Sequence, residues 1–207
     1  MTRVYRSTIA LAVLLAAVGA GGSACRLRRP DVIAARMIEP QLIEPASQPS
    51  TSATRLGNGG AEAVQIRLLE TQARSHIGRR LLHQAPDGEL VEDAVWRWSS
   101  APPRYLDSAL HLAFASSPDV LLVDSGDAEA MSVTLITWHL ETASSVQLVG
   151  AVEVVVTTPD RMVLSHLIRR SESVSSELPG NLAAAAGRLL QTLASASVER
   201  AAQQRSR

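Results

Sequence analysis

The chain has 207 residues, of which 46% are hydrophobic and 19% are charged. Because globular domains hold roughly 100–150 residues, the length allows one folded domain with accessory segments, and the composition excludes a chain that is disordered throughout. Basic and acidic residues balance at 20 each, for a formal net charge of +0, which argues against binding nucleic acid through a broad positive field.

Residues 1–24 have the layout of a secretory signal peptide. Arg3 and Arg6 precede an apolar run from Ile9 to about Ala20, and small residues then lead to Cys25, the single cysteine. The apolar run is shorter than the roughly 20 residues that a membrane-spanning helix needs. We therefore expect the leader to be cleaved.

The segment Gly22-Ser23-Ala24-Cys25 resembles the lipobox of bacterial lipoproteins, in which the cysteine thiol receives a diacylglycerol and becomes the new N-terminus. The resemblance implies lipidation of Cys25, and Arg26 in the next position implies sorting to the outer membrane, with the domain facing the periplasm. The lipobox usually begins with an aliphatic residue, where this chain has Gly22. Ordinary cleavage after Ala24 and an uncleaved anchor are the two alternatives.

Residues 25–60 are predicted to be a lipidated cysteine followed by a flexible tether, because Pro, Ser, Thr and Gly accumulate there. Within this segment, Met37-Ile38-Glu39-Pro40 is nearly repeated by Leu42-Ile43-Glu44-Pro45. The near-repeat predicts either a short extended docking peptide or an extended spacer.

The folded domain is predicted to occupy residues 61–207. Alternating apolar and polar residues in Val64–Leu69 predict a strand with one buried face. The runs Arg80–Gln84 and Glu89–Trp98 predict a hairpin, since Pro86-Asp87-Gly88 between them suits a tight turn.

An apolar stripe at helical spacing predicts the first helix, capped by Ser99 or Ser100 and opened by Pro102-Pro103. Ser117-Pro118 is expected to end this helix. The next run, Asp119–Asp124, is short and apolar between its acids, which predicts a central strand covered on both faces. The helical stripe consists of Leu106, Ala109, Leu110, Ala113 and Phe114.

Three β-rich runs, Met131–Leu140, Val146–Thr157 and Arg161–Val174, predict an antiparallel meander. A last helix, capped by Asn181, is expected to lie on the sheet and to approach it closely at Gly187. The order of elements predicts an α/β fold with a mixed β-sheet and two long helices.

No catalytic residue, metal ligand or cofactor site is predicted. The histidines lie in different elements without metal-ligand spacing, and we expect His139 and His166 to be surface or hydrogen-bonded residues. Glu92 and Asp93 are adjacent in a strand, so they should point to opposite faces. A hydrolase assembled from scattered residues is the enzymatic alternative. The five histidines are at positions 76, 83, 111, 139 and 166.

Three aromatic residues, Trp96, Trp98 and Tyr105, are candidates for binding a partner, because large aromatic side chains supply much of the energy at protein interfaces. Core packing is the alternative interpretation of all three.

The domain resembles the ABC-type transport auxiliary lipoproteins over about residues 64–198. The resemblance depends on the order of Arg80–Gln84, Gly88-Glu89-Leu90, Trp98, Pro102-Pro103, Tyr105-Leu106 and the helix to Phe114, and Asp119–Asp124.

The resemblance implies a fold like the N-terminal, anticodon-binding-like domain of TolB. It also implies a non-catalytic, membrane-anchored auxiliary subunit of an ABC-type transporter that moves lipids or hydrophobic molecules across the cell envelope. Its expected partners are an MCE-domain protein, the permease and ATPase, and further copies of itself. The alternative is another lipoprotein binding module that regulates or assembles an envelope complex.

Overall fold

The computed structural model describes residues 34–43, 63–142, 145–158, 160–176 and 178–203, and Ala34–Arg207 form one compact unit. The predicted signal peptide, Cys25 and most of the predicted tether lie outside the described residues. Neither helix of the described part is long and apolar enough to cross a membrane.

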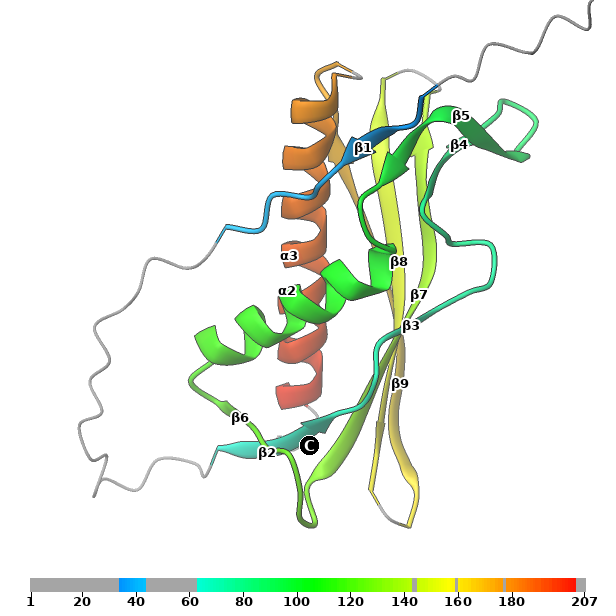
Figure 1. Ribbon diagram of the computed structural model, residues 1–207. Helices are drawn as coiled ribbons and strands as arrows, with labels where there is room; N and C mark the ends of the chain where they lie inside the picture. Colours follow the sequence, from blue (N-terminus) through cyan, green and yellow to red (C-terminus); the bar gives the residue numbers. More distant parts are fainter. Residues whose placement is uncertain (1–33, 44–62, 143–144, 159, 177, 204–207) are drawn as a thin grey trace, which may run out of the picture. The chain divides into compact units, whose positions relative to one another are not determined.

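A mixed sheet is organised around one long strand, β7 (Glu129–Glu141) (Figure 1). Three short strands pair in parallel along one edge of β7, and a long hairpin pairs antiparallel along the other. The short strands are β2 (Val64–Leu68), β3 (Gln72–Ala73) and β4 (Arg80–Gln84); the hairpin is β8 (Gln147–Thr157) and β9 (Met162–Ser173).

Three further strands extend the sheet beyond β2 and β4. β5 (Leu90–Trp98) pairs antiparallel with β4, and β1 (Arg36–Ile38) pairs in parallel with β5. β6 (Val120–Leu122) pairs in parallel with β2. The sheet order is therefore β1-β5-β4-β7-β2-β6, with β8 and β9 joined through the second edge of β7.

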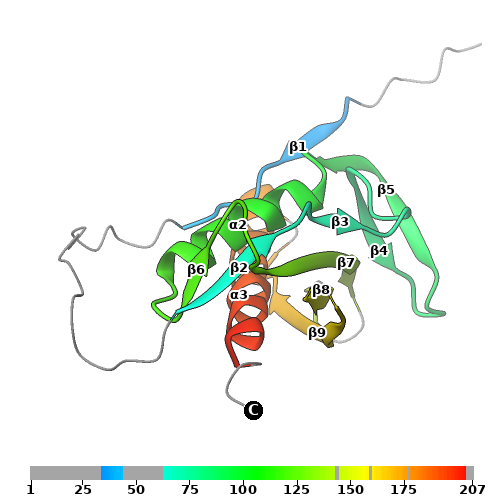
Figure 2. The same ribbon diagram turned by 90° about the horizontal axis from the view of Figure 1, so that it is seen from below.

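Both helices, α2 (Pro102–Ser116) and α3 (Pro179–Gln203), lie on the same side of the sheet (Figures 1 and 2). Their apolar stripes meet alternate side chains of β7 and β8, as the period-two geometry of a strand requires. The shared core includes Leu106, Leu110, Met131, Val133, Leu135, Val152, Val154, Leu189, Leu190 and Leu193, all fully buried.

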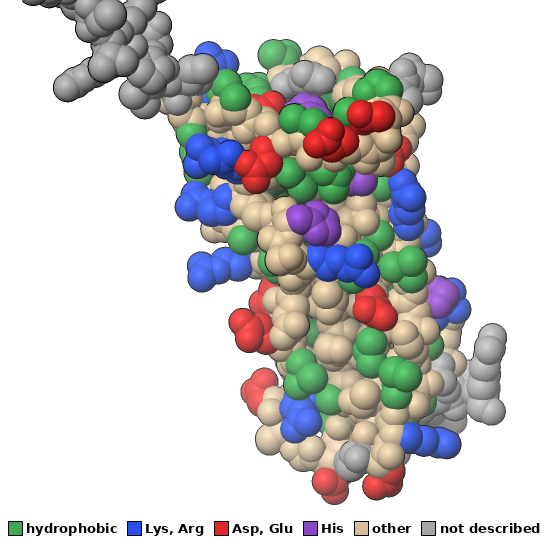
Figure 3. Space-filling view, turned by 90° about the vertical axis from the view of Figure 1, so that its right-hand side faces the viewer, with side chains coloured by type: hydrophobic (Ala, Val, Ile, Leu, Met, Phe, Trp, Pro, Cys, Tyr) green, Lys and Arg blue, Asp and Glu red, His purple; other side chains and the backbone are tan. Residues whose placement is uncertain are grey.

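No helix of the described residues lies on the opposite face of the sheet. There, acidic, basic and hydrophobic side chains are interspersed (Figure 3). His139 lies in β7 and is only 6% exposed, and its Nε2 is 3.2 Å from Glu141 Oε1. It is thus a hydrogen-bonded histidine, one of the two roles predicted for it.

The structure confirms the mixed α/β class, the β4–β5 hairpin, the antiparallel meander of β7, β8 and β9, and both helices. The central position predicted for Asp119–Asp124 is wrong. β6 pairs only with β2 among the described strands, and Leu121 is 51% exposed. A short apolar run has the same sequence pattern at the end of a sheet as in its middle, so periodicity did not separate the two.

Both predicted helix caps are also wrong. α2 begins after Ala101 with no side-chain cap, and its first positions are prolines, which have no amide hydrogen to satisfy. α3 begins at Pro179, so Asn181 lies within the first turn, where its Nδ2 donates to Ser176 Oγ at 2.6 Å.

The tether prediction is wrong for residues 34–43, which are part of the folded unit. We call this segment the N-terminal strap. Its β1 extends the sheet at β5, and its later residues cross α3, where the Gln41 amide donates to Ala183 O at 3.1 Å. The proline-rich composition suggested a spacer, but the strap binds mainly through its main chain, which composition does not reveal.

Gly187 marks a close approach to α3, but the approaching segment is the strap and not the sheet. A Cβ atom at residue 187 would overlap the main chain of Gln41, and backbone atoms cannot move aside as a flexible side chain can. Glycine is therefore the residue that lets the strap cross the helix.

We expect Gly187→Ala to lower the free energy of unfolding by about 1–3 kcal/mol, since it forces the strap away from α3. Without the strap contact, replacing glycine by alanine within a helix would raise the free energy of unfolding by about 1 kcal/mol. A loss of stability would therefore identify the steric conflict. Urea denaturation measures the change. Gly180→Ala is the matched control, because Gly180 lies in the same helix with open space around it; equal effects of the two variants would contradict the prediction.

Candidate interaction site

The three aromatic candidates meet at one corner of the fold, where β5 passes into α2. Trp96 and Trp98 lie on β5 and pair with Arg36 and Ile38 of the strap, while Tyr105 lies in the first turns of α2. The structure thus brings the three residues together, and the segment that they surround is the N-terminal strap.

Trp98 belongs to the core. Its side chain is fully buried, and its ring lies 5.6 Å from that of Trp138, at an interplanar angle of 58°. Tilted aromatic pairs at this separation are favourable beyond the area that they bury. Trp98 therefore supports the corner from inside and presents no surface to a partner.

Trp96 is half-buried, and the guanidinium carbon of Arg36 lies 5.4 Å from the centre of its ring. This is the geometry of a cation–π interaction, worth about 0.5–1 kcal/mol at an exposed site. One face of Trp96 is thus covered by the strap.

Ser99 connects the strap, β5 and α2, whereas its sequence position predicts only a helix cap. Its amide donates to Ile38 O at 2.9 Å, and its hydroxyl contacts Ile38 O, the Glu39 carboxylate and the Tyr105 hydroxyl. The Tyr105 hydroxyl also accepts from the Ser100 amide at 2.7 Å. The polar end of Tyr105 is therefore used inside the protein.

We expect Tyr105→Phe to lower the free energy of unfolding by about 1–2 kcal/mol, because it removes the acceptor of a part-buried amide and the partner of Ser99. Thermal or urea denaturation measures the loss. Ser116→Ala removes an exposed hydroxyl of the same helix and should change stability by less than about 0.5 kcal/mol. An unchanged free energy of unfolding in the Tyr105→Phe variant would show that the hydroxyl does not stabilise this corner.

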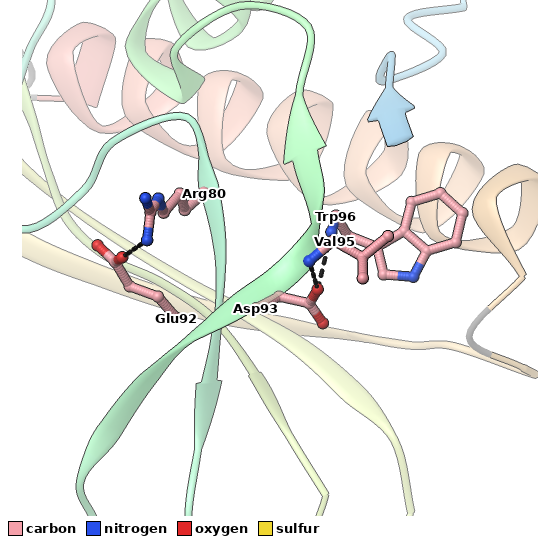
Figure 4. Close-up of polar contacts among 5 residues, drawn as sticks. All are labelled: Arg80, Glu92, Asp93, Val95 and Trp96. Carbon is pink, nitrogen blue, oxygen red and sulfur yellow. Dashed lines mark hydrogen bonds and ion pairs between the residues drawn. The ribbon is translucent and has the colours of Figure 1, made fainter. Parts of the chain in front are cut away.

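An irregular stretch of β5 places Trp96 and Trp98 against the strap. Arg80 pairs with Arg97 and Leu82 pairs with Glu92, so one residue of β4 opposes residues 93–96 of β5. The Asp93 carboxylate accepts from the Val95 and Trp96 amides, each at 2.7 Å (Figure 4). It supplies the acceptor that these amides lack in the interrupted ladder.

Glu92 and Asp93 point to opposite faces, as predicted, and Glu92 pairs with Arg80 (Figure 4). Asp93 Oδ2 lies 2.9 Å from His83 Nε2. Burial raises the pKa of Asp93, but the hydrogen bonds from Trp96, Val95 and His83, together with the charge of His83, outweigh burial, so its pKa lies below the usual value. The carboxylate is thus stabilised in its ionised form.

We expect Asp93→Asn to lower the free energy of unfolding by about 1 kcal/mol at neutral pH, because the amide keeps the shape but not the charge. A lowered pKa in the folded state stabilises the protein above the unfolded value of about 3.9, and this contribution is lost as the pH falls through the folded value. The difference between the wild type and Asp93→Asn should therefore shrink below about pH 4. Urea denaturation at several pH values tests this, and a pH-independent difference would contradict it.

A second polar cluster lies on the exposed face of α2. Thr71 Oγ1 donates to Asp107 Oδ1 at 3.0 Å, and His111 Nδ1 is 2.9 Å from Asp107 O. Ser108 Oγ donates to Arg104 O at 3.2 Å. The two hydroxyls of this cluster thus donate to a carboxylate and to a main-chain carbonyl.

No protein-family model and no curated protein matches the sequence. Solved structures match it in fold. Protein XCC0632 from Xanthomonas campestris, described as a DUF330 family model, is similar over 83% of this chain and 96% of its own, with a TM-score of 0.63 and 16% identity. The hypothetical protein CT253 from Chlamydia trachomatis is similar over 69% of this chain and 97% of its own, with a TM-score of 0.52 and 12% identity.

An uncharacterized protein is similar over 81% of this chain and 97% of its own, with a TM-score of 0.56 and 13% identity. At these identities the likeness establishes a shared fold and nothing about activity, since one fold serves many functions.

Proposed function

We propose that the protein is an exported lipoprotein, anchored through Cys25 to the outer membrane, and that its periplasmic domain is a non-catalytic auxiliary subunit of an ABC-type MCE transporter for lipids or other hydrophobic molecules. The observation that carries the proposal is the order of its parts: a signal-like leader, a lipobox-like Gly22–Cys25, and then a mixed α/β domain.

The domain supports the proposal because its conspicuous site is a place where chain segments bind to one another. The strap, β5 and α2 meet through main-chain pairing, aromatic packing and the Ser99 hydrogen bonds. Such a site suits a protein that assembles with others, and the fold shared with XCC0632 is compatible with the family resemblance. The MCE-domain protein, the permease and the ATPase are the proposed partners.

The strap also gives the anchor a mechanical role. Because residues 34–43 are bound to the sheet and to α3, the segment between Cys25 and the folded unit is shorter than the composition implies. Residues 26–33, which separate Cys25 from the strap, span at most about 28 Å when fully extended. An anchored domain would therefore be held close to the membrane surface, where transporter components can reach it.

The test is affinity capture from envelope extracts of cells that express the full chain, with Cys25→Ser as the control. We expect a cysteine-linked diacylglycerol by mass spectrometry, recovery in the outer-membrane fraction, and co-purification of MCE-domain and permease components. The Cys25→Ser form should lose the acyl chains and most of the capture, because two or more acyl chains are needed for stable attachment. An unmodified thiol, or an acylated protein that captures no transporter component, would refute the proposal.

A further inference from the structure

The site that holds the N-terminal strap recognises mostly main-chain atoms. β1 pairs through residues 36–38 with residues 96–98 of β5, and the Ser99 amide donates to Ile38 O. Further along, the Gln41 amide donates to Ala183 O, and the Gln191 side chain donates to Ile43 O. Any extended segment that has amide hydrogens at the right places can make these contacts.

Three strap side chains add selectivity. Ile38 is 1% exposed in the core, the Glu39 carboxylate contacts the Ser99 hydroxyl, and Arg36 covers Trp96. Met37, between them, is 47% exposed and adds little. The ligand of this site is thus an extended segment in which an isoleucine is followed by a glutamate.

The same two residues recur five positions later. Leu42-Ile43-Glu44-Pro45 repeats Met37-Ile38-Glu39-Pro40 with identical Ile, Glu and Pro. In the structure Ile43 is 65% exposed, so the side chain that matches the buried Ile38 is unused. The chain therefore carries a second copy of the ligand beside the first.

We propose that the edge of β5, Ser99 and the Ala183–Gly187 turn of α3 form a binding site for an apolar-Ile-Glu-Pro segment, and that Leu42–Pro45 is its second ligand. The second ligand enters when the strap slips by five residues, so that Ile43 takes the place of Ile38 and Glu44 that of Glu39.

Nearly every contact can form again after this slip. Main-chain pairing with β5 does not depend on side chains, and Ala46, which would replace Gln41 beside Gly187, also has an amide hydrogen. Two contacts are lost: Gln41 would replace Arg36 over Trp96, and Ser47 would replace Leu42, which packs against the core. Both losses favour the observed register, so the slipped register is the minor one.

The slip would change the length of the tether. It adds five residues between Cys25 and the domain, about 17 Å when extended, so the domain can stand at two distances from the membrane. This consequence depends on the lipid anchor of the proposed function, whereas the binding site and its two ligands do not.

A double-mutant cycle tests the site in the mature full chain carrying Cys25→Ser, with Ile38→Asp, Ile43→Asp and the double variant. The Ser99 amide donates to Ile38 O of the strap, so its hydrogen exchange, measured at single-residue resolution by mass spectrometry, reports whether the site is occupied. We expect Ile43→Asp to have little effect and Ile38→Asp to raise exchange by much less than the double variant does, since the second ligand still binds. The double variant should raise exchange by on the order of a hundredfold or more, because each register then buries a charge.

Exchange in the core of α3 is the internal control, and it should stay slow in all three variants. Equal effects of Ile38→Asp and the double variant would overturn the proposal, because the second segment would then contribute nothing. Because the Cys25→Ser chain is not lipidated, this result is independent of whether the proposed anchor and transporter role are correct.

Cysteine cross-linking reports the register directly. In the observed register Met37 pairs with Arg97, so Met37→Cys with Arg97→Cys should form a disulfide, and Ile38→Asp should reduce its yield. Leu42→Cys with Arg97→Cys should cross-link in the slipped register, and Ile38→Asp should raise its yield several-fold. Failure of the 42–97 disulfide to form in the Ile38→Asp background would refute the slip.

Discussion

The pairing of β7 along both of its edges is the constraint on which the rest of the structure depends. One edge pairs in parallel with β2, β3 and β4, in sequence order, and the other pairs antiparallel with β8, which in turn pairs with β9. This arrangement carries β4 and its partner β5 to the end of β7 that holds Trp138, which then packs on Trp98. The aromatic corner, and with it the strap site, follows from the position of β7.

Close approach of main chains explains why this corner binds an extended segment. Asp93 satisfies the amides of the irregular stretch in β5, which frees the following residues to pair with β1. Gly187 lets the strap pass over α3 without a side chain in between. Both features serve main-chain recognition, which tolerates changes of sequence in the bound segment as long as its buried isoleucine is retained.

The sequence predicted what depends on side-chain periodicity and missed what depends on main-chain contacts. Alternation and helical stripes correctly predicted β7, β8, β9 and both helices, since burial of one face imposes those patterns. Pro, Ser and Gly dominate the sequence around the strap and indicate a tether, and only the isoleucine in the near-repeat points to a buried contact. The structure brings Trp96, Trp98 and Tyr105 to one corner, where Trp96 and Trp98 pair with a segment of their own chain.

The spacing of the near-repeat is what permits two registers. In an ordinary strand a slip by an odd number of residues turns every side chain to the opposite face, which the core forbids. Here the slip equals the length of the repeat, so an isoleucine again faces the core and a glutamate again meets Ser99. A slip of two residues would place Pro40 in the Ile38 position, and a proline there offers no amide to the ladder. A slip of four residues would place Leu42 there but would put Ile43, which has no carboxylate for Ser99, in the Glu39 position. The sequence thus favours a step of five residues.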